Sequence, residues 1–307
     1  MKNLLVIPVL FFSVFSISQK IEGIDINHQD FEYASNSVNE KFTVKRIALK
    51  TGVELEYVEQ GNANGIPVLF LHGISDSWHS FETNLPHLPG SIHAFVISQR
   101  GHGNSDKPVN AYNPKQFAAD VASFIEHQKL GPVVIVGHSM GGVNAQRFAV
   151  DYPQLTKALV IVDSDPSLIK NEGMSEFIDM VMKLEGPVLS REFMVEFQKS
   201  TIMKPIDSAY FETIVSEGLK VPTAVFQSAL KEVLEHNLVE DIKSIQKPVL
   251  IFWGDKDLVC LREGQEVLKA NIKNAKWMEY KGIGHALHWE EPVRFVNDLV
   301  QFINSLQ

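Results

Sequence analysis

The sequence predicts an α/β protein in which a doubly wound, mostly parallel, eight-stranded sheet carries an inserted helical cap. Short apolar runs alternate with helix-like stretches along most of the 307 residues. Several of these runs are hydrophobic throughout, as expected of strands that are buried on both faces of a parallel sheet. One interval, residues 166–242, contains only helix-like pieces and therefore predicts a cap between two core strands.

The strands and helices of the predicted core follow one another in a regular order. The predicted strands are Phe42–Ile47, Val53–Val58, Pro67–Leu71, Ala94–Ile97, Val133–Val136, Ala158–Val162, Pro248–Phe252 and Trp277–Tyr280. The first two flank the turn Thr51-Gly52 and should form a hairpin. The predicted helices are Pro114–His127, Val143–Tyr152, Arg262–Ala270 and Pro292–Ser305. Strands that alternate with helices imply right-handed crossovers and therefore a parallel arrangement.

The domain boundaries follow from this order. Residues 41–165 and 243–307 are expected to form the core and residues 166–242 the cap. Five of the eight methionines and several phenylalanines, among them Phe177, lie in the cap segment. Adaptable side chains of this kind suit the roof of a pocket for an apolar small molecule. The alternative is that they form the hydrophobic interior of the cap itself.

The N-terminus is typical of a secretory signal peptide. Lys2 is followed by an apolar run that ends at Phe15, and small residues precede a plausible cleavage point after Ser18. We therefore expect residues 1–18 to be removed on export to the periplasm or the medium, and residues 19–40 to form an N-terminal extension. The run is shorter than the roughly 20 residues that span a bilayer, so stable membrane insertion is not expected. An uncleaved anchor is the alternative.

Composition narrows the possible partners. The formal net charge of −9, from 37 acidic and 28 basic residues, disfavours nucleic acid and anionic membranes. A single cysteine, Cys260, excludes an intramolecular disulfide. Eleven histidines are present, but no pair has the spacing of metal ligands, so we expect neither a metal nor another cofactor. The expected partner is a small molecule, and the oligomeric state is left open.

The strongest local signal is Gly137-His138-Ser139-Met140-Gly141, which lies between a predicted strand and a predicted helix. This Gly-x-Ser-x-Gly pattern is typical of a nucleophile elbow. The serine would lie on a strained turn that exposes its hydroxyl at a helix N-terminus, where the positive end of the helix dipole favours developing negative charge.

Five motifs in a fixed order resemble the α/β-fold hydrolase superfamily, in particular its capped, esterase-like members with a serine nucleophile. They are Leu71-His72-Gly73, Arg100–Ser105, Gly137–Gly141, Gly254–Asp257 and Gly284-His285. The resemblance extends from about Phe42 to the C-terminus. It implies Ser139 as the nucleophile, His285 as the base and Asp257 as the acid.

Other residues compete for two of these roles. His288 follows closely after His285, and we expect it to be a packing residue. Asp255 is expected to form a turn beside Gly254. Some relatives carry the acid one strand earlier, where this chain has Asp163-Ser164-Asp165.

The resemblance also implies the groups that surround the reaction. The backbone N–H groups of Ile74 and Met140 would form the oxyanion hole. Trp78 and Phe177 are the expected substrate-binding residues, although Trp78 and its neighbour Phe81 could instead pack the first helix. The chain departs from the family at Ser98, where an aspartate is common, and this change is expected to weaken hydrogen bonding in the turn Arg100–Ser105.

The sequence therefore predicts a serine hydrolase that cleaves a small, fairly apolar carboxylic ester or lactone through an acyl-enzyme. A serine at the elbow argues against epoxide hydrolases and haloalkane dehalogenases, whose relatives use a carboxylate there. The same triad could act on an amide or peptide, a thioester or a carbon–carbon bond, or perform perhydrolysis. A non-catalytic binding protein of the same fold is the alternative from another class, and the intact set of triad residues argues against it.

Overall fold

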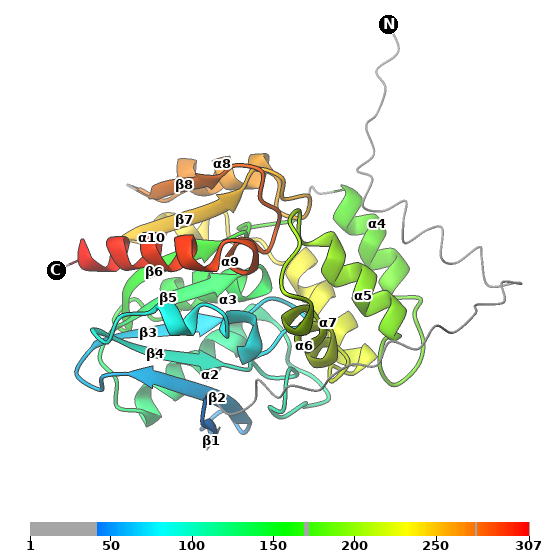
Figure 1. The fold of residues 1–307 in the computed structure, drawn as a ribbon, viewed down its shortest axis with the longest axis horizontal. Helices are drawn as coiled ribbons and strands as arrows, with labels where there is room; N and C mark the ends of the chain where they lie inside the picture. Colours follow the sequence, from blue (N-terminus) through cyan, green and yellow to red (C-terminus); the bar gives the residue numbers. More distant parts are fainter. Residues whose placement is uncertain (1–41, 169–171, 274, 307) are drawn as a thin grey trace, which may run out of the picture.

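The computed structural model describes residues 42–168, 172–273 and 275–306 of the chain (Figure 1). The signal peptide expected in residues 1–18 and the extension expected in residues 19–40 lie outside this part. Within the described part, no helix is both long enough and apolar enough to cross a membrane.

An eight-stranded sheet forms the centre of the molecule, in the spatial order β1-β2-β4-β3-β5-β6-β7-β8. Its strands are β1 (Val44–Ala48), β2 (Glu54–Gly61), β3 (Ile66–Leu71), β4 (Ile92–Ile97), β5 (Val133–His138), β6 (Thr156–Val162), β7 (Val249–Gly254) and β8 (Lys276–Tyr280). β2 runs antiparallel to both β1 and β4, and the remaining pairs are parallel. The predicted doubly wound, mostly parallel sheet is confirmed.

The continuous apolar runs are explained by burial on two faces. In β5, Val133 and Ile135 pack into one hydrophobic cluster, whereas Val134 and Val136 pack into another on the opposite face. β3 and β7 divide their residues between the same two clusters. Both faces of a central parallel strand therefore need apolar side chains, which removes the alternation of a half-exposed strand.

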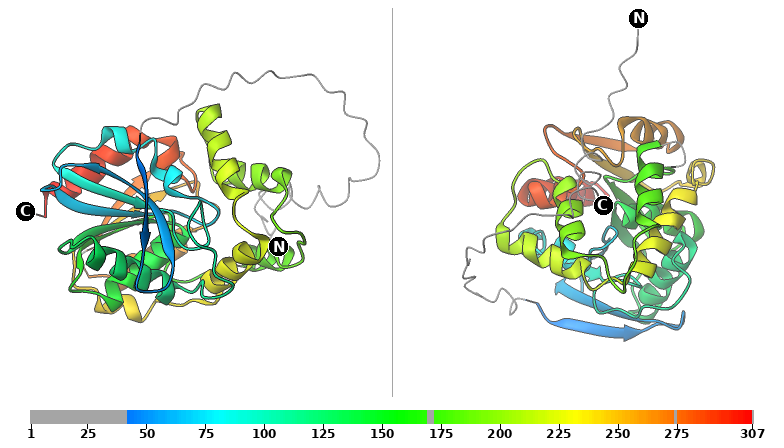
Figure 2. Two further views of the ribbon diagram at one scale, coloured as in Figure 1. Left: turned by 90° about the horizontal axis from the view of Figure 1, so that it is seen from below. Right: turned by 90° about the vertical axis from the view of Figure 1, so that its right-hand side faces the viewer.

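Helices cover the two faces of the sheet (Figure 2). One face carries α2 (Pro114–His127), α3 (Met140–Asp151) and α8 (Arg262–Asn271). The other carries the short helices η1 (Trp78–Phe81) and η2 (Leu85–His87) together with α10 (Pro292–Asn304). A further short helix, α9 (Leu287–Glu290), follows the last strand and was not predicted from the sequence.

A helical cap lies between β6 and β7 and stands beyond the ends of the parallel strands (Figure 1). It consists of α4 (Glu172–Val181), α5 (Arg191–Ser200), α6 (Ser208–Gly218) and α7 (Thr223–Glu235), and η3 (Asp241–Ser244) leads back to the sheet. The side chains of Ser190 and Asp207 cap α5 and α6 by accepting hydrogen bonds from backbone N–H groups. The cap helices thus lie within the segment 166–242 that the sequence assigned to them.

Candidate active site

Ser139 lies in the sharp turn between β5 and α3. Its φ of 52° and ψ of −121° are strained for a residue with a side chain. The turn needs glycine on both sides, since a Cβ on Gly137 would lie 2.2 Å from the carbonyl oxygen of Gly141, and one on Gly141 would lie 2.3 Å from that of Leu71. These close approaches explain the Gly-x-Ser-x-Gly pattern in physical terms.

The structure brings together the three residues proposed as a triad. Nε2 of His285 lies 2.9 Å from Oγ of Ser139, and Nδ1 of His285 lies 2.9 Å from Oδ2 of Asp257. The other carboxylate oxygen of Asp257 accepts hydrogen bonds from the backbone N–H groups of Val259 and Cys260, at 2.7 and 2.9 Å. Three donors therefore fix the carboxylate, which in turn orients the imidazole ring.

Asp163, the alternative acid, has another role in this geometry. Its carboxyl group accepts hydrogen bonds from the backbone N–H groups of Gly254 and Leu287, at 2.8 and 3.4 Å. It thereby ties the end of β6 to the end of β7 and to the segment that follows His285. Burial raises the pKa of Asp163 well above its usual range, and the nearby Asp257 carboxylate acts in the same direction. Asp165, also buried, contacts Gln265 instead of the histidine.

The loop that carries His285 is held from several sides. The carbonyl oxygen of His285 lies 2.9 Å from Nε2 of His138, a residue of the elbow itself. The carboxylate of Glu290 accepts a hydrogen bond from the backbone N–H of Gly284 at 2.8 Å. Ala286 donates its N–H to the carbonyl oxygen of Thr201 in the cap. His285 is therefore positioned by both the core and the cap.

His288 is completely buried and makes no hydrogen bond to Ser139 or Asp257. Its Nε2 lies 3.1 Å from Oγ of Ser80, and its ring packs against Phe81. Burial lowers the pKa of His288 well below its usual value, with the neighbouring His285 acting in the same direction. These contacts favour the packing role that the sequence indicated for it.

The backbone N–H groups of Ile74 and Met140 are the expected donors to an oxyanion. Met140 is the first residue of α3, where N–H groups have no partner inside the helix. Neither N–H donates to a backbone carbonyl within the described part of the chain. The side chains of both residues line the same pocket as Ser139.

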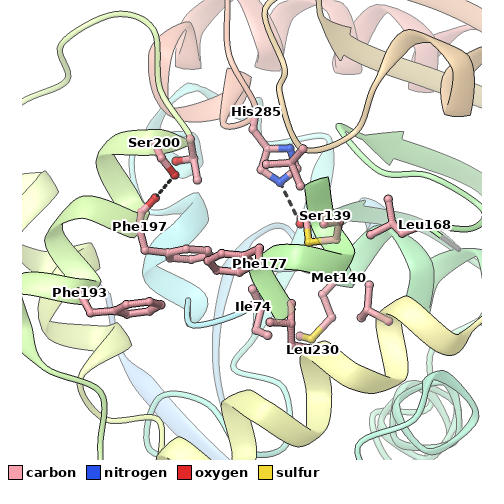
Figure 3. A pocket seen from close by; sticks show the side chains of 14 residues that line it. Ile74, Ser139, Met140, Leu168, Phe177, Phe193, Phe197, Ser200, Leu230 and His285 are labelled. Carbon is pink, nitrogen blue, oxygen red and sulfur yellow. Dashed lines mark hydrogen bonds between the residues drawn. The ribbon is translucent and has the colours of Figure 1, made fainter. Parts of the chain in front are cut away.

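The pocket in front of Ser139 is almost entirely apolar (Figure 3). Its walls surround about 780 Å³ of space, counting the opening to solvent, which is within the usual range of small-molecule sites. Besides Ile74, Ser139, Met140 and His285, the lining residues are Leu168, Met174, Phe177, Phe193, Phe197, Ser200, Thr201, Leu230, Val233 and Val259. Most of these belong to the cap, so the cap supplies the greater part of the wall.

Three phenylalanine rings pack against one another on the cap side of this pocket (Figure 3). The rings of Phe177 and Phe193 each lie nearly parallel to that of Phe197, with centroids 5.9 and 6.1 Å away. Phe226 meets Phe193 and Phe197 edge-on. Rings held by one another in this way give a firm apolar wall.

Trp78, expected to bind substrate, does not line this pocket. Its indole ring stacks on the ring of His79, with centroids 3.8 Å apart, and meets Phe42 edge-on. Phe81 packs against Phe70 and Phe295 in the hydrophobic core. Both side chains therefore have the packing role that was the alternative for them.

The turn beside Ser98 is not weakened by the missing aspartate, because a carboxylate comes from another strand. Glu56 of β2 is only 3% exposed and accepts hydrogen bonds from the Ser98 hydroxyl at 2.9 Å and from the Asn104 side-chain amide at 2.6 Å. Ser98 itself accepts the backbone N–H of Trp78. The pair Glu56 and Ser98 thus replaces a single acidic side chain.

Among the residues that the structure describes, one group has the types of atoms that bind a metal. Ligand atoms of Asp257, Cys260 and His285 lie within 4.8 Å of one another. A metal ion bound there would replace the hydrogen bond between Asp257 and His285. Burial raises the pKa of the Cys260 thiol well above its usual value, which disfavours the thiolate that a metal requires. These residues therefore fit a proton-transfer site better than a metal site.

The elbow, the histidine and acid loops and the cap together define an enzyme site of the capped α/β type. A family model described as alpha/beta hydrolase fold matches residues 66–292. The chain belongs to this family. It is 28% identical over 273 residues to lipase 3 of Moraxella sp. (strain TA144), covering 86% of this chain and 85% of that protein. It is 33% identical over 286 residues to the soluble epoxide hydrolase of Corynebacterium sp. (strain C12), covering 85% and 97%.

Solved structures show the same fold. The esterase EaEST from Exiguobacterium antarcticum superimposes with a TM-score of 0.77 at 21% identity, over 85% of this chain and 100% of that one. The crystal structure of E-2-(acetamidomethylene)succinate hydrolase gives 0.75 at 23% identity, over 86% and 99%. At these identities the likeness establishes the architecture, whereas the chemistry has to be argued from the site.

Proposed function

We propose that this chain is a serine hydrolase that cleaves a small, fairly apolar carboxylic ester or lactone through an acyl-enzyme. The observation that carries the proposal is the hydrogen-bonded chain from Ser139 through His285 to Asp257, with 2.9 Å at each step, at the base of an apolar pocket. Names such as lipase and esterase among the similar proteins support the same reaction class.

The proposed reaction follows from the order in which Ser139, His285 and Asp257 contact one another. His285 accepts the Ser139 proton at Nε2 while the serine oxygen attacks the carbonyl carbon, and Asp257 stabilises the resulting imidazolium. The carbonyl oxygen becomes negative and accepts hydrogen bonds from the N–H groups of Ile74 and Met140. His285 then gives its proton to the departing alcohol oxygen. A water molecule, deprotonated by the same histidine, releases the carboxylic acid and restores Ser139.

The lining of the pocket supports an apolar acyl or alcohol group. The described lining residues include no Asp, Glu, Lys or Arg. A charged substrate group buried there would lose its hydration without gaining an ion pair. The wall of Phe177, Phe193 and Phe197 instead gains from covering apolar surface.

Other outcomes of the same triad are separate hypotheses: cleavage of an amide or peptide, a thioester or a carbon–carbon bond, and perhydrolysis. A panel of p-nitrophenyl esters, lactones and aminoacyl anilides distinguishes most of these. We expect the esters of short to medium acyl chains and the lactones to be turned over fastest. Faster turnover of the anilides would replace the ester proposal by amidase activity.

The nucleophile is tested with a fluorophosphonate probe at neutral pH. The wild-type protein should be labelled once, and Ser139→Ala should not be labelled. Ser200→Ala is the matched control, because Ser200 also lines the pocket but donates its hydroxyl hydrogen bond to the carbonyl oxygen of Phe197. Equal labelling of wild type and Ser139→Ala would show that the nucleophile has been assigned wrongly. A wild type that is never labelled would favour a binding protein.

The proposed export is a separate point that rests on the sequence of residues 1–18. We expect the exported protein to begin near Gln19 and to be found in the periplasm or the medium. N-terminal sequencing of protein from those fractions checks this. A chain that begins at Met1 would instead indicate the uncleaved form.

A further inference from the structure

A second buried carboxyl group lies next to the active site, in the loop that follows β3. Asp76 is 2% exposed and lies two residues after Ile74, the proposed oxyanion donor. Its carboxyl group accepts a hydrogen bond from the hydroxyl group of Ser80 at 3.2 Å, and its backbone N–H donates to the carbonyl oxygen of Gly73 at 3.4 Å. The hydrogen bond between Asp76 and Gly73 therefore closes a turn that contains Ile74.

A second donor to the Asp76 carboxyl group comes from the cap. The side-chain amide of Gln198, in α5, donates to Oδ1 of Asp76 at 3.2 Å and to the hydroxyl oxygen of Ser75 at 3.0 Å. Gln198 is 1% exposed, so these bonds do not compete with bulk water. One cap residue thus holds both residues that directly follow Ile74.

The loop needs such support because its backbone is strained. Ser75 has a φ of 67°, in the left-handed region that residues with a side chain seldom adopt. It is also completely buried, so only its hydrogen bonds and packing hold it there. A relaxation of Ser75 would turn the Ile74–Ser75 peptide and thereby shift the backbone of Ile74, whose N–H lies in the peptide unit before it.

Asp76 is also held from the core side. Ser80, its partner, lies beside Nε2 of His288 and accepts the indole N–H of Trp289 at its carbonyl oxygen, at 2.9 Å. Burial raises the pKa of Asp76 to about 7, an effect that its hydrogen bonds and the nearby His285 only partly offset. Burial disfavours the ionised form of a carboxyl group, so a buried aspartate at this position suggests a role beyond packing.

We propose that Gln198 and Asp76 are positioning residues that couple the docked cap to the oxyanion hole by fixing the loop that carries Ile74. The inference rests on the proposed function, because it assumes an oxyanion during turnover. The pair contacts no reacting atom and acts through the backbone. When the amide of Gln198 is lost, substrate should still enter the apolar pocket, but the transition state should lose part of its stabilisation.

The test compares two glutamines of the cap. Gln198→Met keeps the length of the side chain and removes the amide group that donates to Ser75 and Asp76. Gln227→Met is the matched control, because Gln227 also donates two hydrogen bonds, to the carbonyl oxygens of Val181 and Leu184, entirely within the cap. For each variant we would measure kcat and KM with p-nitrophenyl butyrate and the inhibition constant of butylboronic acid, which forms a tetrahedral adduct with a serine nucleophile.

We expect Gln198→Met to lower kcat by roughly 10- to 100-fold, less than the loss of an entire oxyanion donor, with little change in KM. Binding of butylboronic acid should weaken by a similar factor. Gln227→Met should change each quantity by less than about threefold. Equal effects of the two variants, or a rise in KM with kcat unchanged, would overturn the positioning role.

A second pair of variants tests the same loop by changing Asp76, the residue that accepts the hydrogen bond from Gln198. Asp76→Ala should lower kcat as Gln198→Met does, and Asp76→Asn, which keeps an acceptor oxygen, should recover most of that loss. The double variant Gln198→Met/Asp76→Ala should be little worse than either single one, because both act on one contact. Additive losses would contradict a shared role. An inert wild type that fluorophosphonate also fails to label would remove the proposed function and this inference together.

Discussion

Nε2 of His285 lies 2.9 Å from Oγ of Ser139, although 146 positions separate the two residues in the chain. The contact arises because Ser139 follows β5 and His285 follows β8, and the carboxyl ends of parallel strands meet at one edge of the sheet. Everything that positions either residue, on the core or on the cap, should therefore affect turnover.

The first prediction concerns the acid. Asp257→Asn should lower kcat for an ester by about 10⁴-fold, because an amide cannot stabilise the imidazolium of His285 and favours the wrong tautomer. Asp163→Asn should keep activity within about tenfold, since the hydrogen bonds of its carboxyl group within the described part of the chain come from the backbone N–H groups of Gly254 and Leu287. Steady-state kinetics of both purified variants provides the measurement. If Asp163→Asn proves the more damaging, the acid lies after β6.

The second prediction concerns the aromatic wall. Phe177→Ala removes a ring that faces the pocket, so KM for a p-nitrophenyl hexanoate should rise about tenfold, while KM for the acetate should change little. Trp78→Phe is the control, because the indole ring of Trp78 packs on His79 outside the pocket. The ratio of the two KM values in each variant is the quantity to compare. An unchanged ratio in Phe177→Ala would mean that the substrate does not reach this wall.

The third prediction concerns the pH dependence of stability. Burial raises the pKa of Asp76 to about 7 from 3.8, so the folded protein holds this proton more tightly than the unfolded chain. The stability that this group contributes is complete below about pH 4 and is lost as the pH rises towards 7. Asp76→Asn has no such group, and its free energy of unfolding relative to wild type should therefore increase by up to about 4 kcal/mol between pH 4 and 7.

Urea unfolding of wild type and Asp76→Asn at several pH values measures this difference. The raised pKa values of Asp163 and Asp165 affect both proteins equally and cancel in the comparison. A difference that does not vary with pH would show that Asp76 is ionised in the folded protein throughout this range.

The fourth prediction concerns the elbow. Gly141→Ala would place a Cβ 2.3 Å from the carbonyl oxygen of Leu71, which cannot move without disturbing β3. We expect the free energy of unfolding to fall by about 3 kcal/mol, at the upper end of the usual cost of overpacking. Gly131→Ala is the control, since a Cβ there meets nothing within 4 Å. Thermal unfolding of both variants checks the expectation, and equal midpoints would contradict it.

Much of the fold could be predicted from local patterns. The runs in β3, β5 and β7 are apolar throughout because their two faces pack into two hydrophobic clusters, and periodicity reports burial directly. Helix α2 has the predicted ends, Pro114 and His127, and the structure adds that the Asn113 side chain caps it while Pro114 suits its first turn. The short helix α9 was missed, since four residues have too little periodicity to be detected.

Ser139 could be named from the sequence because the geometry of an elbow demands glycine at fixed spacing, whereas His285, Asp257 and the two oxyanion donors were implied by the resemblance to α/β-fold hydrolases. The prediction that Trp78 lines the pocket was wrong. The sequence alone does not show whether an aromatic side chain near a site lines the pocket or packs on its neighbours, as Trp78 does on His79. Asp76, Gln198 and Glu56 belong to no motif, and their roles could not have been read from the chain. A hydrogen bond between a cap helix and a core loop depends on how two distant segments pack, so only the tertiary structure decided how the loop beside Ser139 is held.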